Sequence, residues 1–134
     1  MAKVQAEIDV DVPASRAYEQ WRRFEDYPRF LTGVEEVRPV DERTLHWRAR
    51  FLGRTQEWDA EITTDEPPSR LAWRTREGPS DVSVAIAPLG PSRSHVIVTD
   101  DIHERGLAAR LAVALGYAER RLQNELAQFR AFVE

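Results

Sequence analysis

The hydrophobic residues of this chain follow one period up to residue 104 and a different period after it. From Gly106 onward they recur every three or four positions, which predicts one long amphipathic helix over 106–133. Before that point most apolar residues alternate with polar ones, as in strands with one buried face. The expected helix stripe consists of Leu107, Leu111, Leu115, Ala118, Leu122, Leu126, Phe129 and Val133. A sheet with a single apolar face and one helix long enough to cover it should therefore form one layered unit.

The first part of the chain predicts a strand and two short helical segments. Residues 3–12 alternate strictly, with apolar side chains at the even positions. Pro13 ends this strand and suits the first turn of a helix, whereas Tyr27-Pro28 interrupts that helix and leaves a short turn or helical stub over 25–31. Six further strands are expected, at 33–40, 44–52, 55–65, 70–76, 81–87 and 94–104.

The turn at Gly53 gives the most specific expectation about strand pairing. If Gly53-Arg54 are the two central residues of a type II′ turn, Trp47 faces Ala60 in the neighbouring strand. If residues 66–69 form the next loop, Asp65 faces Arg70. Basic and acidic side chains then share the outer face of the sheet, and the tryptophans share the inner face. The outer face includes His46, and His95 is also expected to be exposed.

The composition excludes several classes of function. The 134 residues include no cysteine, so disulfides, thiolate metal sites and thiol nucleophiles are excluded. A formal net charge of −4 argues against general nucleic-acid binding, which requires a basic face. No apolar run approaches the ~20 residues of a membrane span, and the N-terminus has no apolar signal segment. We expect a single domain over 1–134, located in the cytoplasm and without stable membrane insertion.

Local motifs cover nearly the whole chain. They are Val12-Pro13-Ala14, Trp21 with Phe24, Tyr27-Pro28-Arg29-Phe30, Val34-Glu35-Glu36-Val37, His46-Trp47-Arg48-Ala49, Glu57-Trp58-Asp59-Ala60-Glu61-Ile62, Arg70-Leu71-Ala72-Trp73-Arg74 and Ala87-Pro88-Leu89-Gly90. Together they resemble the SRPBCC or START-like superfamily, in particular its polyketide cyclase/dehydrase and coenzyme-Q-binding-type members. The resemblance implies an α+β helix-grip fold, in which a seven-stranded antiparallel sheet wraps around a long C-terminal helix and two short helices follow the first strand.

The same resemblance implies a cavity that holds a small hydrophobic ligand between the sheet and the terminal helix. The residues expected to bind it are Phe30, Trp47, Phe51, Trp58, Trp73, Leu111 and Leu115. An apolar lining with few polar groups suits a lipid, an isoprenoid or a polyketide. Alternatively, the tryptophans fill this space by packing on one another, and the domain is an accessory or interaction module.

Candidates for chemistry are few. Strand parity turns Asp100 toward the cavity with its apolar neighbours, and Tyr27 stands in the expected entrance segment, so these two are the candidate catalytic residues. The chain contains no nucleophile elbow and no phosphate-binding glycine loop. Because neighbouring strand residues point to opposite faces, Asp101 and His103 do not converge with Asp100 on a metal, and we expect neither a metal nor a cofactor.

Two functions are open for a chain of this pattern, acting as a monomer or a homodimer. One is carriage or sequestration of the hydrophobic ligand without chemistry. The other is aromatase/cyclase or dehydratase activity on a polyketide-like ligand, in which the cavity holds the substrate in a reactive conformation. The missing catalytic motif favours the first.

Overall fold

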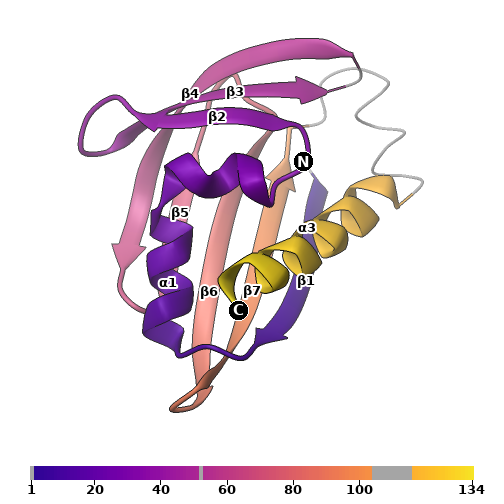
Figure 1. Ribbon diagram of the computed structural model, residues 1–134. Helices are drawn as coiled ribbons and strands as arrows, with labels where there is room; N and C mark the ends of the chain where they lie inside the picture. The colour runs from indigo at the N-terminus through magenta and orange to yellow at the C-terminus, as the bar shows by residue number, and fades with distance from the viewer. Residues whose placement is uncertain (1, 52, 104–115) are drawn as a thin grey trace.

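The computed structural model describes residues 2–51, 53–103 and 116–134. Within them, seven antiparallel strands form one sheet in the order β1-β7-β6-β5-β4-β3-β2, which curves around a C-terminal helix (Figure 1). This confirms the predicted α+β helix-grip fold. The elements are β1 (Ala2–Val10), α1 (Ala14–Arg22), the 3-10 helix η1 (Phe24–Arg29), β2 (Val34–Pro39), β3 (Thr44–Phe51), β4 (Arg54–Glu66), β5 (Arg70–Arg74), β6 (Ser80–Gly90), β7 (Arg93–Ile102) and α3 (Tyr117–Val133).

The C-terminal helix packs its apolar stripe against the concave face of the sheet, on the same side as α1 (Figure 1). Its buried apolar side chains are Leu122, Leu126, Phe129 and Val133. The prediction of one uninterrupted helix over 106–133 was wrong at Gly116, whose φ of 72° is incompatible with a continuing right-handed helix. The part of that prediction over 106–115 lies outside the described residues.

The β3–β4 hairpin forms, but its register differs by two residues from the prediction. Trp47 pairs with Trp58 instead of Ala60. The reason is the position of Gly53, which has a φ of 76° and is the second of the two connecting residues, where the prediction made it the first. Because a shift of two residues preserves the side-chain alternation, the tryptophans remain on the predicted inner face.

A bulge in β4 overturns the predicted pairing next to the β4–β5 turn. The register shifts by one residue within β4, so Asp65 pairs with Leu71 and not with Arg70. This turns Asp65 from the outer face toward α1, where the Tyr18 hydroxyl donates a hydrogen bond to its carboxylate. The Arg22 Nε lies 3.0 Å from the same carboxylate, so the bulge anchors α1 to the sheet.

Strand ends also differ from the prediction. β6 continues to Gly90, beyond the predicted strand end at residue 87, with an irregularity after Pro88. A bulge also lies in β2, between Val34 and Glu36. Such irregularities bend the strands that contain them.

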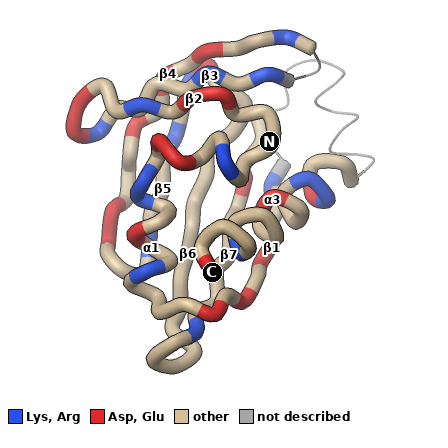
Figure 2. The backbone as a smooth tube through the Cα atoms, in the orientation of Figure 1, with Lys and Arg blue, Asp and Glu red and all other residues tan. Residues whose placement is uncertain are grey.

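Basic and acidic positions are interspersed over the described surface, with both signs on most elements (Figure 2). His46 lies on the outer face as predicted, with its ring nitrogens 2.7 Å from Asp59 and 3.0 Å from Glu57. His95 was expected to be exposed, but its side chain is only 26% exposed because it lies against β1, with Nδ1 2.5 Å from Asp9. Each of these two histidines therefore contacts an aspartate at the paired position of the neighbouring strand.

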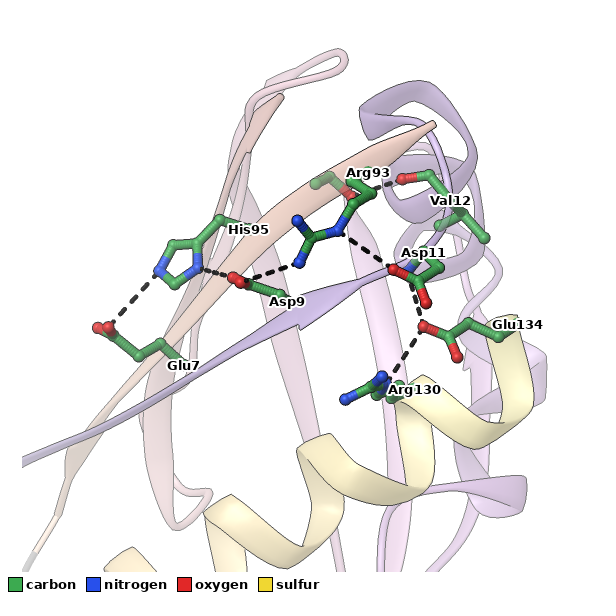
Figure 3. Close-up of polar contacts among 9 residues, drawn as sticks. Glu7, Asp9, Asp11, Val12, Arg93, His95, Arg130 and Glu134 are labelled. Atoms are coloured by element: carbon green, nitrogen blue, oxygen red, sulfur yellow. Dashed lines mark hydrogen bonds and ion pairs between the residues drawn. The ribbon is translucent and has the colours of Figure 1, made fainter. Parts of the chain in front are cut away.

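Ionic contacts hold the C-terminal end of α3 to the edge of the sheet (Figure 3). Arg93 on β7 lies 3.4 Å from Asp9 and 3.2 Å from Asp11. The backbone N–H of Asp11 donates to the Glu134 carboxylate at 2.6 Å, and Arg130 Nε lies 3.2 Å from that carboxylate. We call Asp9, Asp11, Arg93, Arg130 and Glu134 the C-terminal network. It positions the end of α3 that lies farther from Gly116.

Candidate functional site

A cavity of about 220 Å³ lies between the concave face of the sheet and α3. A cavity of ~150 Å³ in another protein holds benzene, so this one has room for one to two fused rings. The tryptophans thus line this space without filling it. The apolar residues around it are Trp21, Leu31, Val34, Trp47, Ala49, Trp58, Trp73, Pro79, Val82, Val98, Ile102, Ala118, Leu122 and Leu126.

Three tryptophans from neighbouring strands form one wall of this cavity. Trp47 stacks on Trp58 with ring centroids 5.8 Å apart and an angle of 11°, and its ring lies 5.8 Å from that of Trp73. Gly78 makes room for this arrangement, since a Cβ at that position would lie 2.5 Å from Cδ1 of Trp58. Strand pairing and a glycine together hold these three rings side by side along the cavity.

The predicted ligand-binding residues divide into three groups. Trp47, Trp58 and Trp73 line the cavity. Phe30 is fully buried in an aromatic cluster with Trp21 and Phe129 and is not part of the lining. Phe51 is the last residue of β3, whereas Leu111 and Leu115 lie outside the described residues.

Tyr27, one of the two candidate catalytic residues, lies in the core behind the cavity wall. Its ring packs against those of Trp47 and Trp73, and its hydroxyl donates to the backbone oxygen of Trp21 at 2.6 Å. Burial raises the pKa of this hydroxyl well above its ordinary value. The 3-10 turn of η1 thus directs Tyr27 into the core, and it is not among the residues that line the cavity.

Asp100, the other candidate, lines the cavity together with two charged residues of α3, Arg121 and Glu125. The Arg121 guanidinium lies 3.9 Å from the Glu125 carboxylate and donates to the backbone oxygen of Thr32 at 2.5 Å. Among the described residues, none donates a hydrogen bond to the side chain of Asp100. We call Asp100, Arg121 and Glu125 the polar cluster; it adds three ionisable side chains to a cavity that is lined mainly by apolar residues.

The two carboxyl groups of the polar cluster titrate near neutral pH. Burial raises the pKa of Asp100 to about 6, against the opposing effect of the Arg121 guanidinium. Burial likewise raises the pKa of Glu125 to about 7; Arg121 opposes this shift and the Asp100 carboxylate adds to it. Groups of this kind can exchange a proton with a bound molecule or accept hydrogen bonds from it.

Sequence reasoning identified Asp100 but not Arg121 or Glu125. Both fall beside Leu122 and Leu126 on the apolar side of the predicted helix. A charged residue on an apolar helix face needs a buried partner or a function, so this was a usable signal. In the structure Arg121 and Glu125 lie beside each other, and Asp100 of strand β7 lines the same cavity.

His103 also borders the cavity, at the end of β7. Its Nδ1 lies 3.1 Å from the Gly78 backbone oxygen, and its Nε2 lies 3.3 Å from the Asp81 carboxylate. Both ring nitrogens therefore contact the turn before β6. In the described part of the chain, no three histidine, aspartate or glutamate side chains are grouped so that they could hold a metal ion. Nor is any described helix long and apolar enough to span a membrane.

The buried position of Glu125 predicts how stability depends on pH. The pKa of Glu125 is about 7 in the folded chain and near 4.5 in the unfolded chain. The contribution of Glu125 to the free energy of unfolding is therefore fully present below about pH 4.5 and is lost as the pH rises through 7. Glu125→Gln should remove this loss. Its effect on the free energy of unfolding should therefore be more favourable at about pH 8 than at about pH 5, by up to about 3 kcal/mol. Urea denaturation at both values measures it.

The exposed Glu119 of the same helix provides the matched control, as Glu119→Gln should keep the pH dependence of the unmodified protein. Equal pH dependence of unfolding in the Glu125→Gln variant and the unmodified protein would contradict the assigned burial.

Comparison with known proteins connects this arrangement to a family. Residues 10–129 match the family model described as polyketide cyclase / dehydrase and lipid transport. An uncharacterized 17.2 kDa protein of Streptomyces lincolnensis is 33% identical over 136 residues, covering 100% of this chain and 91% of that protein.

Solved structures resemble the fold at lower sequence identity. The Zhui aromatase/cyclase from Streptomyces sp. R1128 aligns with a TM-score of 0.82 and 17% identity over 98% of this chain and 93% of its own. A START superfamily protein from Mycobacterium smegmatis aligns with a TM-score of 0.78 and 13% identity over 98% of this chain and 96% of its own. These likenesses concern the fold.

Proposed function

Because this chain belongs to the polyketide cyclase / dehydrase and lipid transport family, we propose that it binds a small aromatic or polyketide-derived molecule in the cavity between its sheet and α3, and carries or sequesters it. The observation that carries the proposal is the cavity of about 220 Å³, whose lining includes an aromatic wall and the polar cluster. A ligand of one to two fused rings would lie against the tryptophans. Its polar end would meet Asp100 and Glu125.

The size of the cavity sets the affinity to expect. Burying a ring system of roughly 150–250 Å² at about 25 cal/mol per Å² contributes about 4–6 kcal/mol. That corresponds to dissociation constants between ~1 mM and tens of micromolar. Binding should therefore be measured with millimolar concentrations of a simple probe such as 2-naphthol, which has two fused rings and one hydroxyl.

The test compares two alanines of α3. Ala118 lines the cavity, whereas Ala127 is exposed on the same helix. We expect Ala118→Phe to occupy part of the cavity and weaken 2-naphthol binding at least tenfold, and Ala127→Phe to leave it unchanged. Tryptophan fluorescence and isothermal titration calorimetry report both. Equal affinities in the two variants, or no binding of 2-naphthol to the unmodified protein, would refute a ligand cavity at this place.

A second candidate function is proton-transfer catalysis of the aromatase/cyclase or dehydratase type, and the polar cluster favours it. With a pKa of about 6 for Asp100 and about 7 for Glu125, the first is largely ionised and the second largely protonated between these values. The Asp100 carboxylate could then take a proton from the carbon next to a bound ketone. Glu125 would donate its proton to the ketone oxygen, which yields the enol.

Hydrogen exchange in a bound ketone tests this second function. In D₂O at about pH 6.5, the protein should speed deuterium incorporation into the methyl group of 2-acetylnaphthalene about 10²-fold or more over buffer, as followed by NMR. Asp100→Asn should abolish the acceleration, and Ala127→Phe should retain it. If incorporation matches that in buffer, binding without chemistry is the function that stands.

A further inference from the structure

Besides Tyr117, five described residues with ionisable side chains line the cavity, and they differ in their exposure to water and in their contacts. They are Arg50, Asp100, His103, Arg121 and Glu125. Arg50 is exposed to water at the end of β3, so its charge is screened. Both nitrogens of His103 contact Gly78 and Asp81, as described above. Among the described residues, this leaves the polar cluster as the charged groups of the cavity that neither lie exposed to water nor belong to the contact of His103 with Asp81.

The polar cluster carries a net negative charge when both of its carboxyl groups are ionised. It contains two carboxylates and one guanidinium. The guanidinium of Arg121 lies beside Glu125 and also donates to the Thr32 backbone oxygen, so it is held on the α3 side of the cavity. Asp100 faces it from β7 and receives no hydrogen bond from any other residue in the described ranges. Glu125 is only 8% exposed, so water screens this cluster weakly.

Resting on the proposed function of the cavity, we propose that Asp100 and Glu125 make it selective for ligands whose polar end donates hydrogen bonds, such as a phenol, an alcohol or an ammonium group, and exclude ligands that end in a carboxylate. An ionised carboxylate only accepts hydrogen bonds, so it binds a ligand group that donates one and leaves an ether oxygen without a partner. A ligand carboxylate would have to lose its hydration beside two like charges. The guanidinium of Arg121 already lies beside Glu125 and donates to the Thr32 backbone oxygen.

Four naphthalenes of similar size and different polar ends test this selectivity in the unmodified protein. At about pH 8 we expect 2-naphthol and 2-naphthylmethylamine to bind at least tenfold more tightly than 2-naphthoate. Both should also bind more tightly than 2-methoxynaphthalene, which has the same rings but no donor. Isothermal titration calorimetry gives all four affinities without any substitution, so folding of a variant does not enter this comparison.

Neutral substitutions then assign the effect to the two carboxyl groups. Asp100→Asn and Glu125→Gln together should raise the affinity for 2-naphthoate at least tenfold and leave that for 2-methoxynaphthalene within about twofold. Glu119→Gln, which removes a charge from the exposed side of α3, should change neither affinity. Circular dichroism shows whether each variant is folded, and the single substitutions replace the double one if it is not.

The outcomes separate this selectivity from the existence of the site. If 2-naphthoate binds the unmodified protein as tightly as 2-naphthol, or if 2-methoxynaphthalene does, the selectivity is overturned while the cavity remains a binding site. If none of the four compounds binds, the proposed function fails and the selectivity with it. If the neutral substitutions leave the preference unchanged, other groups cause it and the assignment to Asp100 and Glu125 is wrong.

Discussion

Truncating Phe129 to alanine is expected to lower the free energy of unfolding by about 3–5 kcal/mol. The ring is fully buried, and its centroid lies 4.7 Å from that of Trp21 and 5.3 Å from that of Phe30. The ring lies where α3, α1 and the end of η1 meet. The surrounding elements therefore cannot easily move together to fill the space that its removal leaves. Urea denaturation followed by circular dichroism measures the loss.

Phe132, three residues further along α3, is the control for this loss. It is only partly buried, beside Phe30 and under the Arg29 guanidinium. Phe132→Ala should cost roughly 1–2 kcal/mol, because less apolar surface leaves the solvent there on folding. Equal losses for Phe129→Ala and Phe132→Ala would show that the contacts of Phe129 with Trp21 and Phe30 do not hold α3 more strongly than the partly buried ring of Phe132 does.

The second large effect is expected for Gly33→Ala, with a loss of about 2–4 kcal/mol. Gly33 has a φ of 85°, which costs a residue with a Cβ about 1–2 kcal/mol. A Cβ there would also lie 2.6 Å from the backbone oxygen of Arg50, a contact that must be relieved by moving β3 away from β2. The Arg50 N–H donates to the Gly33 oxygen at 2.7 Å, so that movement strains a backbone hydrogen bond.

Gly53→Ala separates the two contributions to this loss. Gly53 has a similar φ of 76°, but nothing lies within 4 Å of the position that its Cβ would take. Its substitution should therefore cost only about 1 kcal/mol. Chemical denaturation of both variants gives the difference. If the two losses are the same, the contact of the new Cβ with the Arg50 backbone oxygen adds nothing to the cost of Gly33→Ala.

The periodicity of the sequence was enough to predict the layered fold, but not the register of every strand. Alternation placed Trp47, Trp58 and Trp73 on one face correctly, because this depends only on parity. The pairing of Trp47 depended on which of two turn positions Gly53 takes, and a two-residue loop containing glycine allows both. The bulge that reorients Asp65 has no marker in the composition of β4. The residues that Asp65 contacts because of this bulge, Tyr18 and Arg22, are far away in sequence.

The same distinction applies to the site. Asp100 could be placed at the cavity because its strand neighbours are apolar, whereas the orientation of Tyr27 and Phe30 depends on how η1 packs, which spacing does not encode. Glu125 and Arg121 were overlooked because a stripe of apolar residues defines a helix face while ignoring the charged residues within it. A charge on that face is the more informative observation for function.

The stacked pair of Trp47 and Trp58 also makes the protein its own optical reporter. Two near-parallel indoles held close together in a chiral setting couple their electronic transitions, so the pair should give a strong near-ultraviolet circular dichroism band. Trp58 is only partly buried and borders the cavity, so a molecule that enters will alter this coupling. Occupancy can thus be followed in the unlabelled protein, and a compound that never changes the band has not reached the aromatic wall.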